Sequence, residues 1–501
     1  MNHSINNTDR PPYGILAVLM IGAFISFLNN TLLNVALPSI MTDLDVETST
    51  VQWLSTGYML VNGILIPTTA FLIQKFSVRH LFLIAMGLFT SGTIIAGLAT
   101  MFPVLLTARM IQASGSAIMM PLLMNVLLVS FPVAKRGTVM GVFGLILMFA
   151  PAIGPTLSGW IIEHNSWRML FHFITPIALV IFILGFFLLK DKKEKVNIHL
   201  DGFSVALSSV GFGGLLYGFS SAGTKGWGSP WVYATITIGV LSLIWFILRQ
   251  SKLKEPMLNF KVFKYPMYSL AIIIMMVVNM AMFSGFMLLP IYTQSILGFS
   301  PMESGLMLLP GAILNAFMSP VTGKLFDRYG GKILALTGLA IMTITTYSLS
   351  NLTFETTYSY LMLIHAIRMF GMSMVMMPIQ TNGLNQLPRR FYPHGTAMNN
   401  TLNQVSGAIG TALIITIMST REANYASQLT AEVTGQMTTS LEQHIALESM
   451  LGGINDAFLI SAIIAVVAFI LAFFIKRATP MEDEEDTSDK IVSNHSKQPA
   501  S

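Results

Sequence analysis

The sequence predicts an all-α polytopic membrane protein in which two six-helix bundles flank two additional central helices. Three observations predict this fold class: the composition, a series of apolar segments and an internal repeat. Of the 501 residues, 53% are hydrophobic and 10% are charged, whereas ordinary soluble domains carry about 25% charged residues. The chain therefore has too little polar surface for a soluble enzyme or a nucleic-acid-binding protein.

Several kinds of chemistry are excluded by what the sequence does not contain. It has no cysteine, which rules out disulfides, thiolate metal sites and iron–sulfur ligation. No GxxxxGK[ST] loop is present, so the chain does not hydrolyse ATP through a P-loop. No His, Asp and Glu cluster gathers at a membrane face, as a membrane-embedded enzyme would need. We expect no catalytic residue, no cofactor, no metal site and no nucleic-acid partner.

A membrane-spanning helix needs about 20 mostly apolar residues, and the sequence contains fourteen segments of this kind. They are 13–37, 51–73, 79–101, 103–129, 137–162, 168–190, 201–222, 231–249, 266–292, 302–325, 331–351, 358–384, 394–418 and 456–476. The first is too long for a signal-peptide core and precedes no small-residue cleavage site, so we expect it to remain as a span.

The basic residues predict the orientation. With both termini in the cytosol, most of the 28 Lys and Arg residues fall on the cytosolic side, as the positive-inside rule requires. Only Arg168, Lys225 and Arg421 then lie in outer loops. The net charge of +5 is thus explained by loop topology rather than by a basic patch for nucleic acid.

These spans give the expected domain organisation. It comprises a cytosolic N-terminus (1–12), an N-terminal six-helix bundle (13–190), two extra transmembrane helices (201–249), a C-terminal six-helix bundle (266–476) that includes an extracellular loop (419–455), and a disordered acidic cytosolic tail (477–501). The outer loop contains no Pro and few Gly, which favours some helix or a hairpin over a plain linker.

An internal repeat supports the two-bundle arrangement. The segment 323–332, after the tenth span, has a degraded copy at 70–79, after the second span. Arg109 in the fourth span and Arg368 in the twelfth are each followed by a Met-Met-Pro sequence. Repeated halves are typical of transporters, and the seventh and eighth spans have no counterpart.

Seven short motifs follow one another in the same order as in a known family. They are Asn34-Val-Ala-Leu-Pro38, Gln52-Trp53, Arg109-x-x-Gln112-x-x-Gly115, Ala150-Pro-Ala-Ile-Gly154-Pro155-Thr-Leu-Ser-Gly159, Pro290-Ile-Tyr292-Thr-Gln294, Gly305-Leu-Met-Leu-Leu-Pro310 and Gly395-Thr-Ala-Met-Asn399-Asn400-Thr-Leu-Asn403-Gln404. Together they resemble the major facilitator superfamily, and within it the fourteen-span drug:proton antiporters of the EmrB/QacA type. The resemblance implies the major facilitator fold, a bacterial cytoplasmic-membrane location and multidrug efflux by alternating access in exchange for protons.

Two segments are expected to act in gating. Gly154, Pro155 and Gly159 in the fifth span would kink the helix and let another helix approach closely. The resemblance implies a hinge there, while ordinary small-residue packing is the alternative. The loop 323–332 begins at Gly323 and contains Asp327 and Arg328. Asp327 could accept hydrogen bonds from Arg328 or from a neighbouring helix N-terminus, forming a latch that breaks in the other transport state.

Two arginines and one histidine inside the spans are further candidates for gating and coupling. A charge near the bilayer centre is costly and usually faces a cavity. We expect Arg109 to be an electrostatic gate near a proton site or a partner of the latch, with snorkelling to the outer interface as the alternative. Arg368 lies three residues after His365, and the two could form one polar face.

Uncharged polar residues at helical spacing predict the substrate pathway. An amide that faced lipid would leave its donors unsatisfied, so we expect these side chains to point inward, although interhelical hydrogen bonds are an alternative. The candidates are Asn29, Asn30, Asn34, Tyr58, Asn62, Gln112, Tyr292, Gln294, Asn399, Asn400, Asn403 and Gln404.

One departure from the family bears on the mechanism. Proton-coupled members commonly carry an acid in the first span, where this chain reads Leu28-Asn29-Asn30-Thr31, and asparagine cannot titrate. No Asp or Glu falls in the middle of a span as drawn above. We expect a monomer that exports hydrophobic or amphiphilic compounds in exchange for protons. A lipid or fatty-acid exporter and an uncoupled facilitator of the same fold are the alternatives.

Overall fold

Long apolar helices make up nearly all of the structure, a computed structural model that describes residues 13–190, 199–432 and 438–478. Within these ranges fourteen helical segments are long and apolar enough to cross a membrane, and no β-strand occurs. The expected fourteen-span, all-α fold class is therefore confirmed. The expected cytosolic N-terminus and nearly all of the acidic tail lie outside the described residues.

The N-terminal bundle contains the first six spans. Its helices are α1 (Tyr13–Asp43), α3 (Trp53–Leu65) with α4 (Thr69–Lys75), α5 (Val78–Gly97), α6 (Phe102–Ser130), α7 (Val133–His164) and α8 (Arg168–Leu188), preceded in the second span by the short α2 (Thr48–Val51). A 3₁₀ turn at Ile66–Thr68 separates α3 from α4, because Pro67 has no backbone N–H to continue the α-helical ladder.

The two extra spans are α9 (Gly202–Lys225) and α10 (Pro230–Lys252), and they contact both bundles. Tyr217 of α9 stacks on Trp53 of α3 at 5.9 Å between ring centroids. Trp227, between α9 and α10, donates to the Thr416 hydroxyl of the C-terminal bundle at 2.6 Å. Most of α10 is exposed, with Trp245 and Leu248 each 58% accessible, as expected for a helix that faces lipid.

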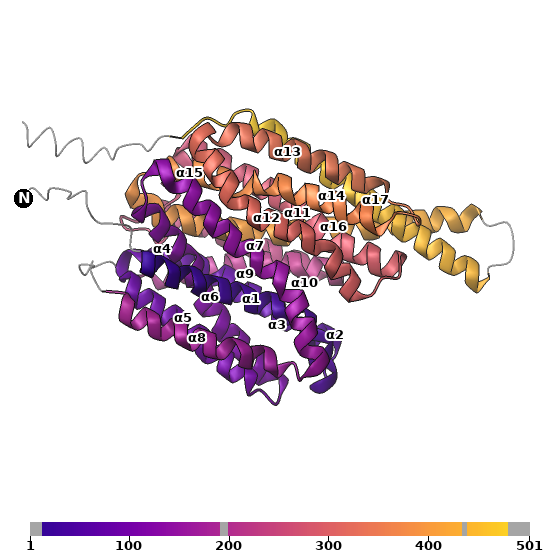
Figure 1. The fold of residues 1–501 in the computed structure, drawn as a ribbon, viewed down its shortest axis with the longest axis horizontal. Helices are drawn as coiled ribbons and strands as arrows, with labels where there is room; N and C mark the ends of the chain where they lie inside the picture. Colours follow the sequence, from indigo (N-terminus) through magenta and orange to yellow (C-terminus); the bar gives the residue numbers. More distant parts are fainter. Residues whose placement is uncertain (1–12, 191–198, 433–437, 479–501) are drawn as a thin grey trace, which may run out of the picture.

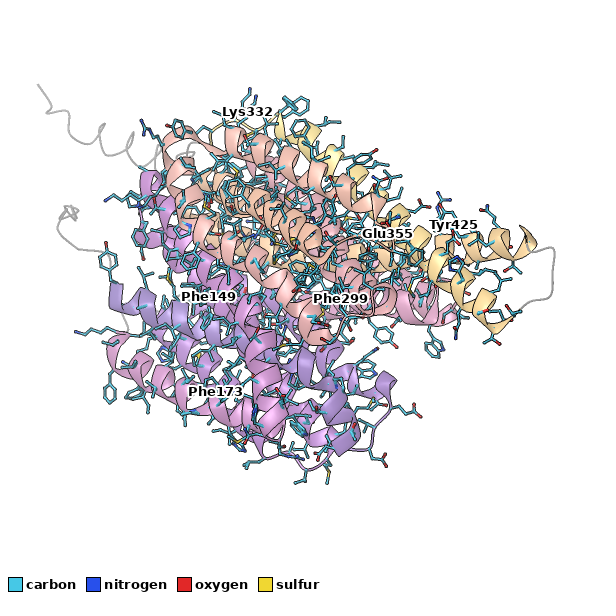
Figure 2. All side chains as sticks on the ribbon, turned by 45° about the vertical axis from the view of Figure 1, so that its right-hand side comes forward. Phe149, Phe173, Phe299, Lys332, Glu355 and Tyr425 are labelled. Carbon is cyan, nitrogen blue, oxygen red and sulfur yellow. The ribbon has the colours of Figure 1, made fainter. Side chains whose placement is uncertain are left out.

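The C-terminal bundle contains the last six spans. Its helices are α11 (Pro266–Ile291), α12 (Pro301–Tyr329), α13 (Gly331–Ser348), α14 (Tyr358–Ser373) with α15 (Met376–Asn385), α16 (Tyr392–Glu432) and α17 (Thr439–Ala472). A capping box begins α12, where Ser300 and Glu303 satisfy each other's backbone N–H groups. The bundle surfaces carry apolar side chains, and Phe173 of the N-terminal bundle points away from the helices in Figure 2.

One predicted loop is helical. We expected 323–332 to be a loop, but α12 continues through Gly323, Asp327 and Arg328 and ends only at Tyr329. The helix ends there because Gly330 adopts a left-handed φ of 82°, which glycine tolerates without steric cost. The gating residues of this segment therefore lie on a rigid helix end.

The last two helices project beyond the other spans as a hairpin (Figure 1). With 41 residues, α16 is about 60 Å long, roughly twice the thickness of the bilayer hydrocarbon. The root of the hairpin is held by Asp456, which pairs with Arg421 at 3.1 Å and accepts from Tyr425 at 3.2 Å. The segment expected as an outer loop is thus two helices, apart from residues 433–437, which are not described.

Candidate functional site

The closest contact between the bundles is the crossing of α7 and α12 at their cytoplasmic ends. In Figure 1, α7 starts beside α15 and α12 and then runs across to the N-terminal bundle. Glycines allow this approach: a Cβ at Gly323 would overlap the carbonyl oxygen of Gly137 and lie 2.9 Å from its carbonyl carbon and 3.1 Å from the Gly141 Cα. Backbone atoms cannot rotate away, so glycine is required here. We call this contact the first crossing.

Asp327 joins the two helices at the first crossing. Its Oδ1 accepts from the Gly137 backbone N–H at 2.8 Å. Its Oδ2 accepts from the Thr138 backbone N–H at 2.8 Å and from the Thr138 hydroxyl at 2.6 Å. These donors lie near the N-terminus of α7, where the helix dipole favours an anion. Of the two partners considered from the sequence, the structure shows the helix end; the Arg328 guanidinium instead lies over the Tyr329 ring at 5.2 Å.

A second interbundle contact beside the first crossing involves Arg136, which sequence reasoning missed. Its Nη1 donates to Asn385 Oδ1 at 3.0 Å, and its Nη2 donates to the Leu128 carbonyl at 2.6 Å. The guanidinium lies 5.0 Å from the centre of the Tyr392 ring, and the residue is 4% exposed. Its position next to Gly137 in the cytoplasmic repeat is the signal that could have identified it.

Beyond the first crossing, α7 and α12 each also pack on their own bundle. Gly154 of α7 lies against Thr31 of α1, and the Ser158 hydroxyl donates to the Leu32 carbonyl at 2.7 Å. On α12, Asn315 donates to the Met369 carbonyl of α14 at 3.1 Å. The two bundles are therefore joined at the cytoplasmic side, and the structure shows a cytoplasm-closed arrangement.

The proposed hinge residues of α7 behave differently from one another. Gly154 permits a close approach, since a Cβ there would lie 2.8 Å from the Thr31 Cβ. Gly159 does not, because no atom lies within 4 Å of a Cβ built there. The expectation of close packing at Gly159 is therefore wrong, because Gly159 lies on the side of α7 away from α1, which its neighbour Ser158 contacts. The side chain of Pro155 lies outside the described part of the structure.

Arg109 is the centre of a polar network in the outer half of the N-terminal bundle. Its Nη1 donates to Gln112 Oε1 and its Nη2 to Asn30 Oδ1, both at 2.9 Å, and its guanidinium lies 4.2 Å from the centre of the Tyr58 ring. Asn29 donates to the same Gln112 oxygen at 3.3 Å. All of these partners are uncharged.

The surroundings of Arg109 correct two sequence-based alternatives. The side chain is fully buried, so it does not snorkel to the outer interface. Its partners lie on α1, α3 and α6, whereas Asp327 bonds to α7, so Arg109 is not a partner of Asp327. Gln112 also donates to the Thr93 hydroxyl of α5 at 2.8 Å. The network thus ties four helices of the bundle around one cation.

Arg368 occupies the corresponding place in the C-terminal bundle. Its Nη2 donates to the Ala281 and Met282 carbonyls at 3.1 and 3.3 Å, and its Nε donates to the Thr346 hydroxyl at 3.1 Å. His365, also fully buried, packs on Gly311 of α12 instead. The two residues therefore contact different helices rather than forming one polar face. The His365 Nδ1 and the Arg368 Nη1 have no hydrogen-bond partner.

The other candidate pathway residues fall into separate groups. Asn403 of α16 accepts from Asn279 of α11 at 2.9 Å, and Asn279 was not predicted. Asn400 donates to the Thr396 carbonyl at 2.8 Å within its own helix. Along the same helix Asn399 is buried and Gln404 is partly buried, and Asn62 is buried in the N-terminal bundle.

Three candidates do not join these groups. Tyr292 is buried at the outer end of α11, where its hydroxyl donates to the Thr353 carbonyl at 2.6 Å. Gln294, two residues further on, is exposed. The structure therefore places both at the outer end of the bundle rather than beside the interior polar residues. The Asn34 side chain lies outside the described part of the structure.

Two carboxylates in contact with cations lie near the ends of helices. Asp43, after the first span, accepts from Arg168 at 2.7 Å and from the Trp167 indole at 3.1 Å, and these hydrogen bonds lower the pKa of its carboxyl. Asp201 accepts from Arg249 at 2.6 Å, which lowers the pKa of Asp201 to about 2. Among the described residues no group of three His, Asp or Glu could hold a metal ion.

Comparisons with known proteins agree with this architecture. The Major Facilitator Superfamily model matches residues 19–411. The uncharacterized MFS-type transporter YhcA of Bacillus subtilis is 46% identical over 93% of both chains. The lincomycin resistance protein LmrB of the same organism is 43% identical over 92% of this chain and 95% of its own.

A solved structure has the same fold. The human organic anion transporter MFSD10 (TETRAN) aligns with a TM-score of 0.64 over 93% of this chain and all of its own chain, at 12% sequence identity. At this identity the likeness concerns the fold alone. With fourteen apolar helices, a matching family model and close bacterial relatives, the chain belongs to the major facilitator superfamily and is a multi-pass protein of the cell membrane.

Proposed function

We propose that the protein is a secondary active exporter of hydrophobic or amphiphilic compounds, including drugs, across the cytoplasmic membrane, and that it works by alternating access in exchange for protons. The observation that carries the proposal is the first crossing. It joins the bundles at the cytoplasmic ends of α7 and α12, through hydrogen bonds that a rocking motion can break and remake.

The substrate class is supported by the relatives and by the chemistry of the interior. LmrB is named for lincomycin resistance, which favours a drug-like substrate here too. The polar residues around Arg109 and on α16 are amides and hydroxyls, which suit neutral or amphiphilic molecules. Methionines add adaptable apolar surface. The Met124 sulfur, for example, lies 3.8 Å from the Asn400 side-chain nitrogen across the bundle interface.

Proton coupling needs a titratable group, and His365 is our candidate. It is a titratable side chain buried in the C-terminal bundle, with one ring nitrogen unpartnered. Asn29 at the usual acidic position favours a second candidate function, an uncoupled facilitator. A lipid or fatty-acid exporter remains the third.

Reconstitution tests these alternatives. The purified protein is placed in proteoliposomes with an imposed pH gradient and an internal pH reporter, and transport of lincomycin, a cationic dye and a fluorescent fatty acid is measured. Uphill drug movement with opposite proton flux supports antiport. Equilibration with a flat pH trace supports the facilitator, and movement of the fatty acid alone supports the lipid exporter.

The role of His365 is tested in the same vesicles. His365→Gln should abolish proton flux and uphill transport while leaving downhill exchange intact. His172→Gln provides the matched control, because His172 is exposed on α8. Unchanged proton coupling in His365→Gln would remove His365 from the mechanism.

A further inference from the structure

The bundles also meet at the cytoplasmic side between α4 and α16, and this contact is related to the first crossing by the internal repeat. At the start of α7 the chain reads Arg136-Gly-Thr-Val-Met, and at the start of α16 it reads His394-Gly-Thr-Ala-Met. Gln74 of α4 occupies the position in the repeat that Asp327 occupies on α12. We call the contact between Gln74 and His394 the second crossing.

The second crossing is built from neutral groups where the first uses a carboxylate. The Gln74 Nε2 lies 3.3 Å from the His394 Nε2 and also donates to the Ala70 carbonyl at 2.9 Å. The other ring nitrogen of His394 accepts from the Asn259 backbone N–H at 3.2 Å. His394, which is 5% exposed, therefore connects both bundles to the segment that follows α10.

A cavity of about 260 Å³ opens beside this contact. Its walls come from four parts of the chain: α4, His199 before α9, the segment after α10, and the start of the thirteenth span. Its charged and titratable lining residues are His199, Lys254, Glu255, Arg390 and His394. Two permanent cations, Lys254 and Arg390, thus face one carboxylate, Glu255, and the net positive charge attracts anions.

The position of the cavity matches that of a lipid headgroup. It lies at the cytoplasmic ends of the spans, level with the last residues of α4 and α10, where the anionic inner-leaflet surface attracts basic residues. Lys and Arg are the side chains that bind phosphate. The rings of Phe71 and Phe391, which also line the cavity, offer apolar surface for the glycerol and acyl portion of a lipid.

We propose that this cavity binds a phosphate anion, as carried by an anionic phospholipid headgroup, and that the anion supplies at the second crossing the negative charge that Asp327 supplies at the first. A phosphate here would bridge Lys254 and Arg390, which belong to the segment after α10 and to the C-terminal bundle, beside Gln74 of the N-terminal bundle. It therefore stabilises the cytoplasm-closed arrangement, in which these three parts meet.

A thermal-shift titration of the purified full-length protein tests the proposal. The probes are dioctanoyl phosphatidylglycerol, dioctanoyl phosphatidylcholine and soluble glycerol phosphate. Stabilisation by phosphatidylglycerol alone identifies a lipid as the source, and stabilisation by glycerol phosphate at similar concentrations identifies a soluble phosphate ester. Equal stabilisation by phosphatidylcholine and phosphatidylglycerol would overturn the proposal, because it would show that the negative charge is not recognised.

Charge-removal variants locate the site. The double variant Lys254→Gln, Arg390→Gln should bind phosphatidylglycerol about 30-fold more weakly, at about 1 kcal/mol for each basic residue near an anionic surface. The matched control is Lys264→Gln, Lys332→Gln, which removes two exposed lysines at the same end of the protein but outside the cavity; Lys332 is labelled in Figure 2. Equal losses in both double variants would refute the assignment to this cavity.

A third variant tests the relation to Asp327. Gln74→Asp places a carboxylate at the second crossing, so it should raise the melting midpoint in phosphatidylcholine and weaken phosphatidylglycerol binding by repulsion. Gln74→Asn, which stays neutral, should retain the binding. If Gln74→Asp binds the anionic lipid as tightly as the unaltered protein, the anion does not replace a carboxylate. These readouts measure binding, so they stand or fall independently of the export proposed above.

Discussion

Replacing Gly323 by alanine should open the first crossing. The added Cβ would lie 2.9 Å from the Gly137 carbonyl carbon and 3.1 Å from the Gly141 Cα, whereas an unstrained contact needs about 3.4–4.0 Å. The helices must therefore separate by roughly half an ångström or more. Overpacking of this kind typically costs about 1–3 kcal/mol. Because the crossing exists only in the cytoplasm-closed arrangement, the cost should shift the equilibrium toward the cytoplasm-open one by about 5–150-fold.

Cysteine labelling can measure this shift, because the chain has no cysteine of its own. Ser319 of α12 is 2% exposed and packs against Gly141 and Gly144 of α7, so a single Ser319→Cys reporter is covered while the crossing is closed. In inside-out vesicles, Gly323→Ala should raise its rate of reaction with a membrane-impermeant maleimide in proportion to the open population.

Two controls make the experiment decisive. Gly159→Ala adds the same methyl group to a membrane helix where no atom lies within 4 Å, and it should leave the rate unchanged. A Ser461→Cys reporter, fully buried in α17, should stay unlabelled in Gly323→Ala, which separates opening from unfolding. Equal Ser319→Cys labelling rates in the Gly323→Ala and Gly159→Ala proteins would refute the argument that backbone contact at Gly323 sets the closed state.

Three further predictions follow from the same contacts. Asp327→Asn should raise Ser319→Cys labelling at least tenfold, because each hydrogen bond to a charged acceptor is worth about 1.5–3 kcal/mol; an unchanged rate would show that the carboxylate does not hold the crossing. Arg109→Lys should abolish drug resistance in cells at unchanged protein level, because lysine cannot donate in two directions from a planar group while stacking on a ring; full resistance would contradict this role. The lowered pKa of Asp201, caused by Arg249, means that this pair stabilises the fold above about pH 4 and less as the pH falls toward 2. The difference in melting midpoint between the unaltered protein and Asp201→Asn should therefore be largest at neutral pH and shrink on acidification, and a constant difference would contradict the assignment.

The spans could be predicted because each of them is a long apolar segment in its own right. Hydrophobic length is a local property, and so is the charge of the loops between the helices. The helical end of α12 could not be predicted in this way, since the charged residues of 323–332 are typical of a loop. The helix ends at Gly330, and the positive φ of this residue is visible only in the structure. The same holds for α16, whose polar residues beyond the membrane continue the helix.

The sequence predicted which residues belong to the candidate site, but it did not predict which of them contact one another. The motif around Arg109 identified the residue, but its acceptor Asn30 and the Tyr58 ring beneath its guanidinium lie on other helices, and only the fold brings them together. Gly154 and Gly159 look alike in sequence, yet a Cβ at Gly154 would meet Thr31 and a Cβ at Gly159 would meet no atom within 4 Å. Arg136 was missed because an arginine at a cytoplasmic helix end is the ordinary expectation for a membrane protein.

The chemistry of the Arg109 network limits where proton coupling can reside. Its acceptors, Asn30 and Gln112, do not ionise, and neither does Thr93, which bonds to Gln112. Arg109 keeps its charge because an arginine guanidinium is effectively always protonated in proteins, and Tyr58 contributes its ring face to the network. The network therefore keeps one charge through the transport cycle and can orient α1 and α6 without carrying a proton. If drug export proves to be proton-coupled, the proton must bind elsewhere, and the unpartnered ring nitrogen of His365 makes that residue the first to replace.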